Sequence, residues 1–69
     1  MKISARMKKA LNDQIAMEAY ASHYYLSMAS WCEFTGYDGS AKLLHKQADE
    51  ERLHMMKIIQ YLNEIGIGA

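Results

Sequence analysis

The chain contains no proline, and its apolar side chains recur at the spacing of one helix face along almost all of its 69 residues. One stripe advances in steps of three and four through Met7, Leu11, Gln14, Glu18, Ala21, Tyr25, Met28 and Cys32, with Ile15, Ser22, Leu26 and Ala29 beside it. A second stripe advances through Leu44, Gln47, Glu51, His54, Ile58, Tyr61 and Ile65, widened by Ala48, Met55, Ile59 and Leu62. Two such stripes predict two long amphipathic helices and an all-α fold.

The two helical segments meet at Thr35–Ser40, where two glycines and a turn-forming aspartate lie close together. Gly36 stands where a left-handed residue can close the first helix, and Asp38 or Ser40 can cap the second. We therefore expect one domain over residues 1–69, with a helix over about 4–35, a turn at 36–39 and a helix over about 40–65. So short a turn requires an antiparallel hairpin.

A hairpin of two amphipathic helices buries one seam and leaves the rest of each apolar stripe in water. A compact chain of this size buries only about 60% of its unfolded surface, and an elongated one buries less. A second copy related by a two-fold axis would cover the exposed stripes. We therefore expect the antiparallel hairpin to complete a four-helix bundle by forming a homodimer, with a larger assembly also open.

Charge and composition exclude several classes of protein. Eight Lys and Arg side chains balance eight Asp and Glu, which argues against a nucleic-acid partner. The single cysteine, Cys32, cannot form an internal disulfide and favours a reducing, cytoplasmic setting. No long apolar run follows the basic N-terminal residues, so we expect neither a signal peptide nor a membrane partner.

Three polar side chains interrupt the two stripes at core-facing positions: Glu18 in the first, Glu51 and His54 in the second. Buried carboxylates are costly unless they are paired or bind a cation. Glu51 and His54 are three residues apart, so a helix presents both to the same space. Counted from the turn, Glu18 lies about 25 Å along its helix, and Glu51 to His54 about 17 to 21 Å along theirs. The three side chains can therefore converge near mid-helix.

A two-fold axis at this level would merge two such half-sites into one. The merged site has four carboxylates and two imidazoles, which is the ligand set of di-iron carboxylate bundles. Two divalent ions match the four carboxylate charges. Oxygen and nitrogen donors without cysteine favour iron or manganese over a closed structural zinc site, although zinc and cobalt should also bind in vitro. The alternative is a polar patch on a loosely packed hairpin.

Other candidate residues have two interpretations each. Tyr25 is either a core aromatic residue or a neighbour of the site that orients Glu51 or donates an electron. Glu50 is either a solvated flank residue or a metal contact. His23 and His45 project away from the stripes, and we propose neither as a ligand. The six methionines are better explained as adaptable core filling than as haem or copper ligands.

Glu18, Tyr25, Trp31, Cys32 and the run Ala48–Met55 resemble the first two helices of a bacterial non-haem ferritin, over about Met7 to Gly66. In that family the residues matching Glu18, Glu51 and His54 bind iron at the ferroxidase centre, where dioxygen oxidises ferrous iron. The residue matching Tyr25 lies beside that centre, which implies a catalytic role, and the residue matching Glu50 is similar to a ligand of an accessory iron site. The resemblance implies iron binding, ferroxidase activity and iron storage.

A ferritin subunit has four long helices and a short fifth, and its third and fourth helices supply further carboxylates. This chain matches only the N-terminal half. Either two copies replace the missing half and bind two iron ions per dimer, or the hairpin is a structural, self-associating scaffold with an incomplete or empty site. A third possibility is a segment that pairs with another protein's hairpin. The resemblance does not imply haem, because Arg52 stands where bacterioferritin has its haem-binding methionine.

Overall fold

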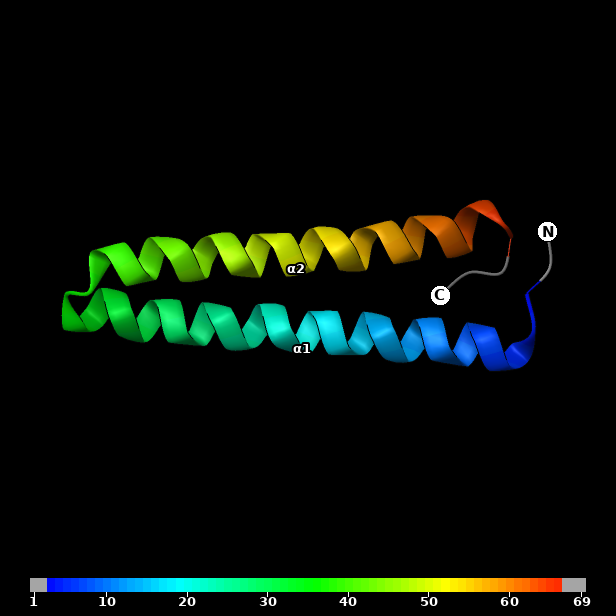
Figure 1. The fold of residues 1–69 in the computed structure, drawn as a ribbon, viewed down its shortest axis with the longest axis horizontal. Helices are drawn as coiled ribbons and strands as arrows, with labels where there is room; N and C mark the ends of the chain where they lie inside the picture. Colours follow the sequence, from blue (N-terminus) through cyan, green and yellow to red (C-terminus); the bar gives the residue numbers. More distant parts are fainter. Residues whose placement is uncertain (1–2, 67–69) are drawn as a thin grey trace.

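The computed structural model describes residues 3–66, which form two antiparallel helices joined by a tight turn (Figure 1). Helix α1 covers Ala5–Thr35 and helix α2 covers Asp38–Glu64. They lie side by side along their length in a rod of 49 × 17 × 11 Å. The expected all-α hairpin is confirmed. Neither described helix combines the length and the apolarity needed to cross a membrane.

The helix ends follow from local hydrogen bonding. Helix α1 begins after Ser4, whose hydroxyl accepts a hydrogen bond from the Met7 amide at 3.1 Å. It ends at Gly36, which has a φ of 88°, and the Tyr37 amide donates to the Cys32 carbonyl at 2.7 Å. Gly36 therefore has the left-handed role expected from the sequence.

Helix α2 begins two residues earlier than the turn composition suggests. Its N-cap is Tyr37, whose side chain makes no capping hydrogen bond, so neither Asp38 nor Ser40 is the cap. Asp38 lies in the first turn instead, where its negative charge is favourable beside the free amides of the helix N-terminus. The turn is thereby reduced to Gly36 and Tyr37.

The seam is the strip of each helix that contacts the other, and it is narrow. Its fully buried members are mostly small: Ala29, Cys32, Ala41, Ala48 and Leu62. Small side chains let the helices approach closely, and near mid-helix the Ser22 hydroxyl donates to the Ala48 carbonyl at 2.9 Å. Larger half-buried side chains such as Leu11, Ile15, Met55 and Ile58 extend the seam toward the chain ends.

The predicted stripes are wider than this seam. A residue four positions before or three positions after a seam residue is rotated about the helix axis by about 40 to 60°, in the same sense for both spacings. Because the two helices are antiparallel, this rotation places such residues of both helices on the same side of the hairpin. The residues so placed, here named the open face, are Met7, Gln14, Met28, Gln47, His54 and Tyr61. All except the half-buried Gln47 are exposed in the hairpin. Each stripe is thus wide enough for two contact surfaces. The hairpin uses the seam and leaves the open face exposed.

Candidate metal centre

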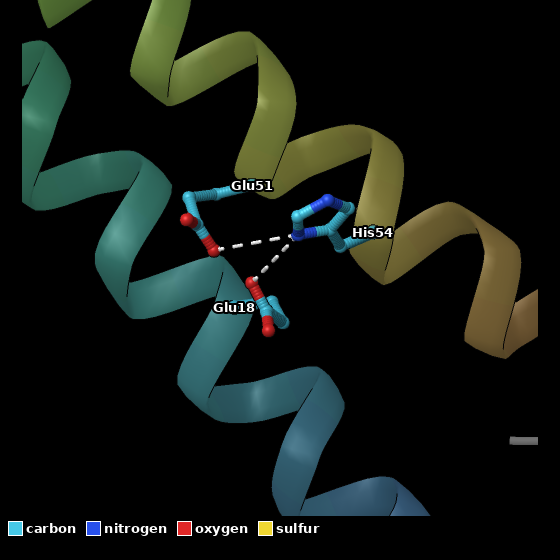
Figure 2. Close-up of side chains that lie close together, drawn as sticks. All are labelled: Glu18, Glu51 and His54. Carbon is cyan, nitrogen blue, oxygen red and sulfur yellow. Dashed lines mark ion pairs between the residues drawn. The ribbon is translucent and has the colours of Figure 1, made fainter.

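Glu18 of α1 meets Glu51 and His54 of α2 near the middle of the hairpin (Figure 2). His54 Nδ1 lies 3.8 Å from Glu18 Oε2 and 3.9 Å from Glu51 Oε2. One potential ligand atom from each side chain lies within 4.8 Å of the other two. The i, i+3 spacing on α2 and the seam position of Glu18 produce this convergence. The structure therefore brings together the three residues that the sequence proposed as metal ligands.

The two carboxylates are withdrawn from water, whereas the imidazole is not. The Glu18 and Glu51 side chains are 14% and 22% exposed, and the His54 side chain is 57% exposed. His54 therefore lies on the open face rather than in the seam, which differs from its expected core position. The two carboxylates therefore lie mostly between α1 and α2, and the cluster is accessible to solvent from the open face.

One oxygen of the cluster has no partner. Glu18 Oε1 accepts a hydrogen bond from Gln14 Nε2 at 2.8 Å, but the buried Glu18 Oε2 accepts none among the described residues. A buried polar atom without a partner is costly and is rare in folded proteins. An orphaned carboxylate oxygen beside a second carboxylate and an imidazole fits a site for a divalent cation.

The protonation of the two carboxyl groups is linked. The neighbouring Glu51 carboxyl group, and then the hydrogen bond from Gln14, lower the pKa of Glu18 from its ordinary value of 4.5. The proximity of Glu18 raises the pKa of Glu51, and burial and the negative charge of Glu18 act in the same direction. Of the two carboxyl groups, Glu18 therefore ionises at the lower pH, and Glu51 keeps its proton to a higher pH. A bound metal ion would favour the ionised form of both.

Two other candidate residues lie outside the cluster. Tyr25 is half-buried on α1, and its ring meets that of Tyr24 edge-on at a centroid distance of 6.3 Å. Glu50 is half-buried beside Glu51, and its charge contributes to the raised pKa of Glu51. Their proposed roles as site neighbour and metal contact stay predictions.

The remaining histidines are placed as expected, away from the site. His23 is exposed, and His45 Nε2 is hydrogen-bonded to the Glu33 carboxyl group. His45 and Glu33, with Asp38, Ala41 and Lys42, line a shallow hollow of about 320 Å³ next to the turn.

Sequence reasoning assigned Gln14 no specific partner, yet it holds Glu18 in place. Its amide fixes one carboxylate oxygen and leaves the other directed at Glu51 and His54. The i, i+4 spacing of Gln14 and Glu18 was the available signal, because side chains four residues apart are neighbours on a helix.

Comparison with known proteins agrees with this geometry. Residues 8–68 match the family model named Ferritin, the ferritin-like domain. A "Probable bacterial non-heme ferritin-like protein" of Haemophilus influenzae is 47% identical over 64 residues, covering 93% of this chain and 39% of that protein. A "Bacterial non-heme ferritin" of Staphylococcus aureus is 42% identical over 67 residues, covering 97% of this chain and 40% of that protein. The chain thus spans about 40% of the length of these curated relatives. No solved structure matches it at a significant level.

Proposed function

This chain belongs to the ferritin family, and on that premise we propose that two copies assemble one di-iron site from Glu18, Glu51 and His54 of each hairpin. Ferrous ions are the substrate, dioxygen is the oxidant, and the cytoplasm is the setting. The observation that carries the proposal is the orphaned Glu18 Oε2, directed at two further metal-binding side chains.

The position of the cluster along the helices favours a symmetric pair. Glu51 is the middle residue of α2, and Glu18 lies two residues before the middle of α1. A two-fold axis perpendicular to the rod at this level places both half-sites together while the helices still overlap along almost their full length. Apolar open-face residues then close the site on both sides, with Met7 and Tyr61 toward the chain ends and Met28 toward the turn.

Each residue type has a distinct task in this assembly. Four carboxylates supply negative charge that stabilises ferric over ferrous iron, and two imidazoles complete the donor set. Gln14 holds the Glu18 carboxylate in its binding orientation. Three side chains from each chain would hold the two ferrous ions, which would give one electron each to dioxygen; with two protons this yields two ferric ions and one hydrogen peroxide. Tyr25 would adjoin the site, Glu50 would contact an accessory ion, and the oxidised iron would be retained as stored iron.

A second candidate function is that of a structural hairpin with an empty site. The 57% exposure of His54 favours it, because a ligand in open solvent gives little affinity by itself. In this case apolar packing alone holds the assembly together, and the carboxylates only lower its stability.

Ferrous titration of the purified chain distinguishes the two functions. The iron-site proposal predicts saturation at two ions per dimer, followed by dioxygen consumption that stops when those ions are ferric. Glu51→Ala should abolish stoichiometric binding and raise the stability of the metal-free dimer. Asp49→Ala, at an exposed position on the same helix, is the matched control and should bind normally. One ion per chain still bound by Glu51→Ala would refute the assignment.

A further inference from the structure

We propose that divalent cations control whether two hairpins associate, so that the dimer forms with metal and dissociates without it. This inference rests on the proposed function, because the same six side chains, three from each chain, hold the ions. It adds that the metal site is a switch for assembly and not only a place where iron is oxidised.

The surface area of the hairpin identifies a second copy as a suitable partner. The accessible surface is 5290 Å², against about 4,400 Å² expected for a compact monomer of this mass. A compact protein of twice the mass exposes about 7,300 Å², so pairing would bury about 3,300 Å² in total. Stable protein interfaces bury about 1,200 to 2,000 Å². The open face thus belongs to a surface large enough for a stable dimer.

The centre of that surface nevertheless opposes pairing. Within residues 3–66, no Lys or Arg nitrogen lies within ion-pairing distance of Glu18 or Glu51, and His54 is the only basic side chain within that distance of either carboxylate. A two-fold axis through the cluster doubles two carboxylates to four and removes water from all of them. Burying like charges without a compensating cation is strongly unfavourable. The apolar residues of the open face therefore favour a dimer, and the carboxylates at its centre prevent one without a cation.

Two divalent ions would turn the contribution of the four carboxylates to the free energy of dimerisation from unfavourable to favourable. They carry four positive charges for four carboxylates, and they supply the partner that Glu18 Oε2 lacks. A ligand that binds only one of two states shifts the equilibrium toward that state. At a free metal concentration 100 times its dissociation constant, one such ion tightens dimerisation about 100-fold, and two tighten it about 10,000-fold.

Sedimentation velocity tests the switch on the full 69-residue chain. Zinc chloride is the probe, because zinc binds the same donor types without redox chemistry, and EDTA provides the metal-free state. We expect monomer in EDTA and dimer in excess zinc at the same protein concentration. Glu51→Gln removes one charge per chain with little change of shape, so it should dimerise in EDTA and lose its response to zinc. Asp49→Asn is the matched control and should behave as the unmodified chain.

Each outcome has a definite meaning. Equal dimerisation of the unmodified chain in EDTA and in zinc overturns the switch, but the proposed function survives if zinc titration still gives two ions per dimer. A chain that stays monomeric in saturating zinc overturns both proposals. Glu51→Gln that stays monomeric in EDTA refutes carboxylate repulsion as the cause. If circular dichroism shows that helicity is lost together with the dimer in EDTA, the switch stands, because pairing then drives folding as well.

Discussion

Glu18 is poorly suited to a two-helix seam and well suited to the proposed metal site. Its carboxylate is 14% exposed, one oxygen is held by Gln14, and the other has no partner within the described residues. A glutamine or leucine at this position would be less costly in a simple two-helix seam. An ionised side chain at this position is what the proposed cation site requires.

Gln14 should set metal affinity without being a ligand. Removing its amide in Gln14→Ala frees the Glu18 carboxylate to rotate, and loss of such a supporting contact costs about 10- to 100-fold in affinity. We expect at least a 10-fold weaker zinc affinity by isothermal titration, with unchanged stoichiometry. Gln60→Ala, at an exposed position of α2, is the control. Equal zinc affinity in both variants would show that Gln14 does not position Glu18.

Glu51 and Glu18 should give the metal-free chain an unusual dependence of stability on pH. Glu51 has a raised pKa, so its stabilising contribution is complete below about pH 4.5 and is lost as pH rises through the raised value. Glu18 has a lowered pKa, so its contribution is present above about pH 4.5 and is lost as pH falls through the lowered value. The free energy of unfolding should peak between the two pKa values.

Urea denaturation in EDTA across the acidic to neutral range measures this profile. For the unmodified chain we expect stability to decline on the neutral side of the maximum. Glu51→Gln cannot lose a proton, so its decline on that side should disappear. Identical pH profiles for the two proteins would contradict the linked protonation of the pair.

At the level of secondary structure, the turn depends on one backbone conformation. Gly36 has a φ of 88°, which strains any residue with a side chain, whereas Gly39 lies in the first turn of α2 and an added Cβ there meets nothing within 4 Å. Gly36→Ala should lower the free energy of unfolding by about 1 kcal/mol. Gly39→Ala should raise it by about 0.4 to 1 kcal/mol. Chemical denaturation at one fixed protein and metal concentration checks both, and a loss of stability in Gly39→Ala would contradict the assigned turn.

The helices were predictable from sequence, but the way they pack was not. Steps of three and four residues and the absence of proline indicate helix regardless of what each face contacts. The exact seam depends on small side chains such as Ala29 and Ala48, which permit close approach but leave little trace in an apolar stripe. Met28 and Tyr61 belong to the predicted stripes, but the periodicity did not show whether they lie in the seam, and both are exposed. The sequence contained no signal that Tyr37 would be the N-cap of α2, because the tyrosine side chain makes no capping hydrogen bond there.

Three of the candidate site residues could be predicted because their chemistry conflicts with their positions. Glu18 and Glu51 lie where the periodicity demands apolar residues, and the structure places both between the helices. The direction of His54 could not be predicted in the same way. Residue spacing defines a stripe of about a third of the helix circumference, and only the packed pair shows which edge of that stripe stays open.

For the whole molecule, the hairpin presents a large apolar surface. Among residues 3–66, thirteen large apolar side chains are exposed, including Phe34 at 92% and the stacked pair Trp31 and Tyr37. Exposed apolar surface on this scale marks an interaction site. The proposed symmetric dimer would cover the apolar surface and bring a cation to the orphaned Glu18 carboxylate oxygen together.

The most direct measurement is a crystal structure of the iron- or zinc-loaded chain with anomalous diffraction at the metal absorption edge. The account predicts two metal peaks beside a two-fold axis, with oxygens of Glu18 and Glu51 and a nitrogen of His54 from both chains in contact with them. Carboxylate oxygens directed at bulk solvent, or metal bound anywhere else in the dimer, would contradict it.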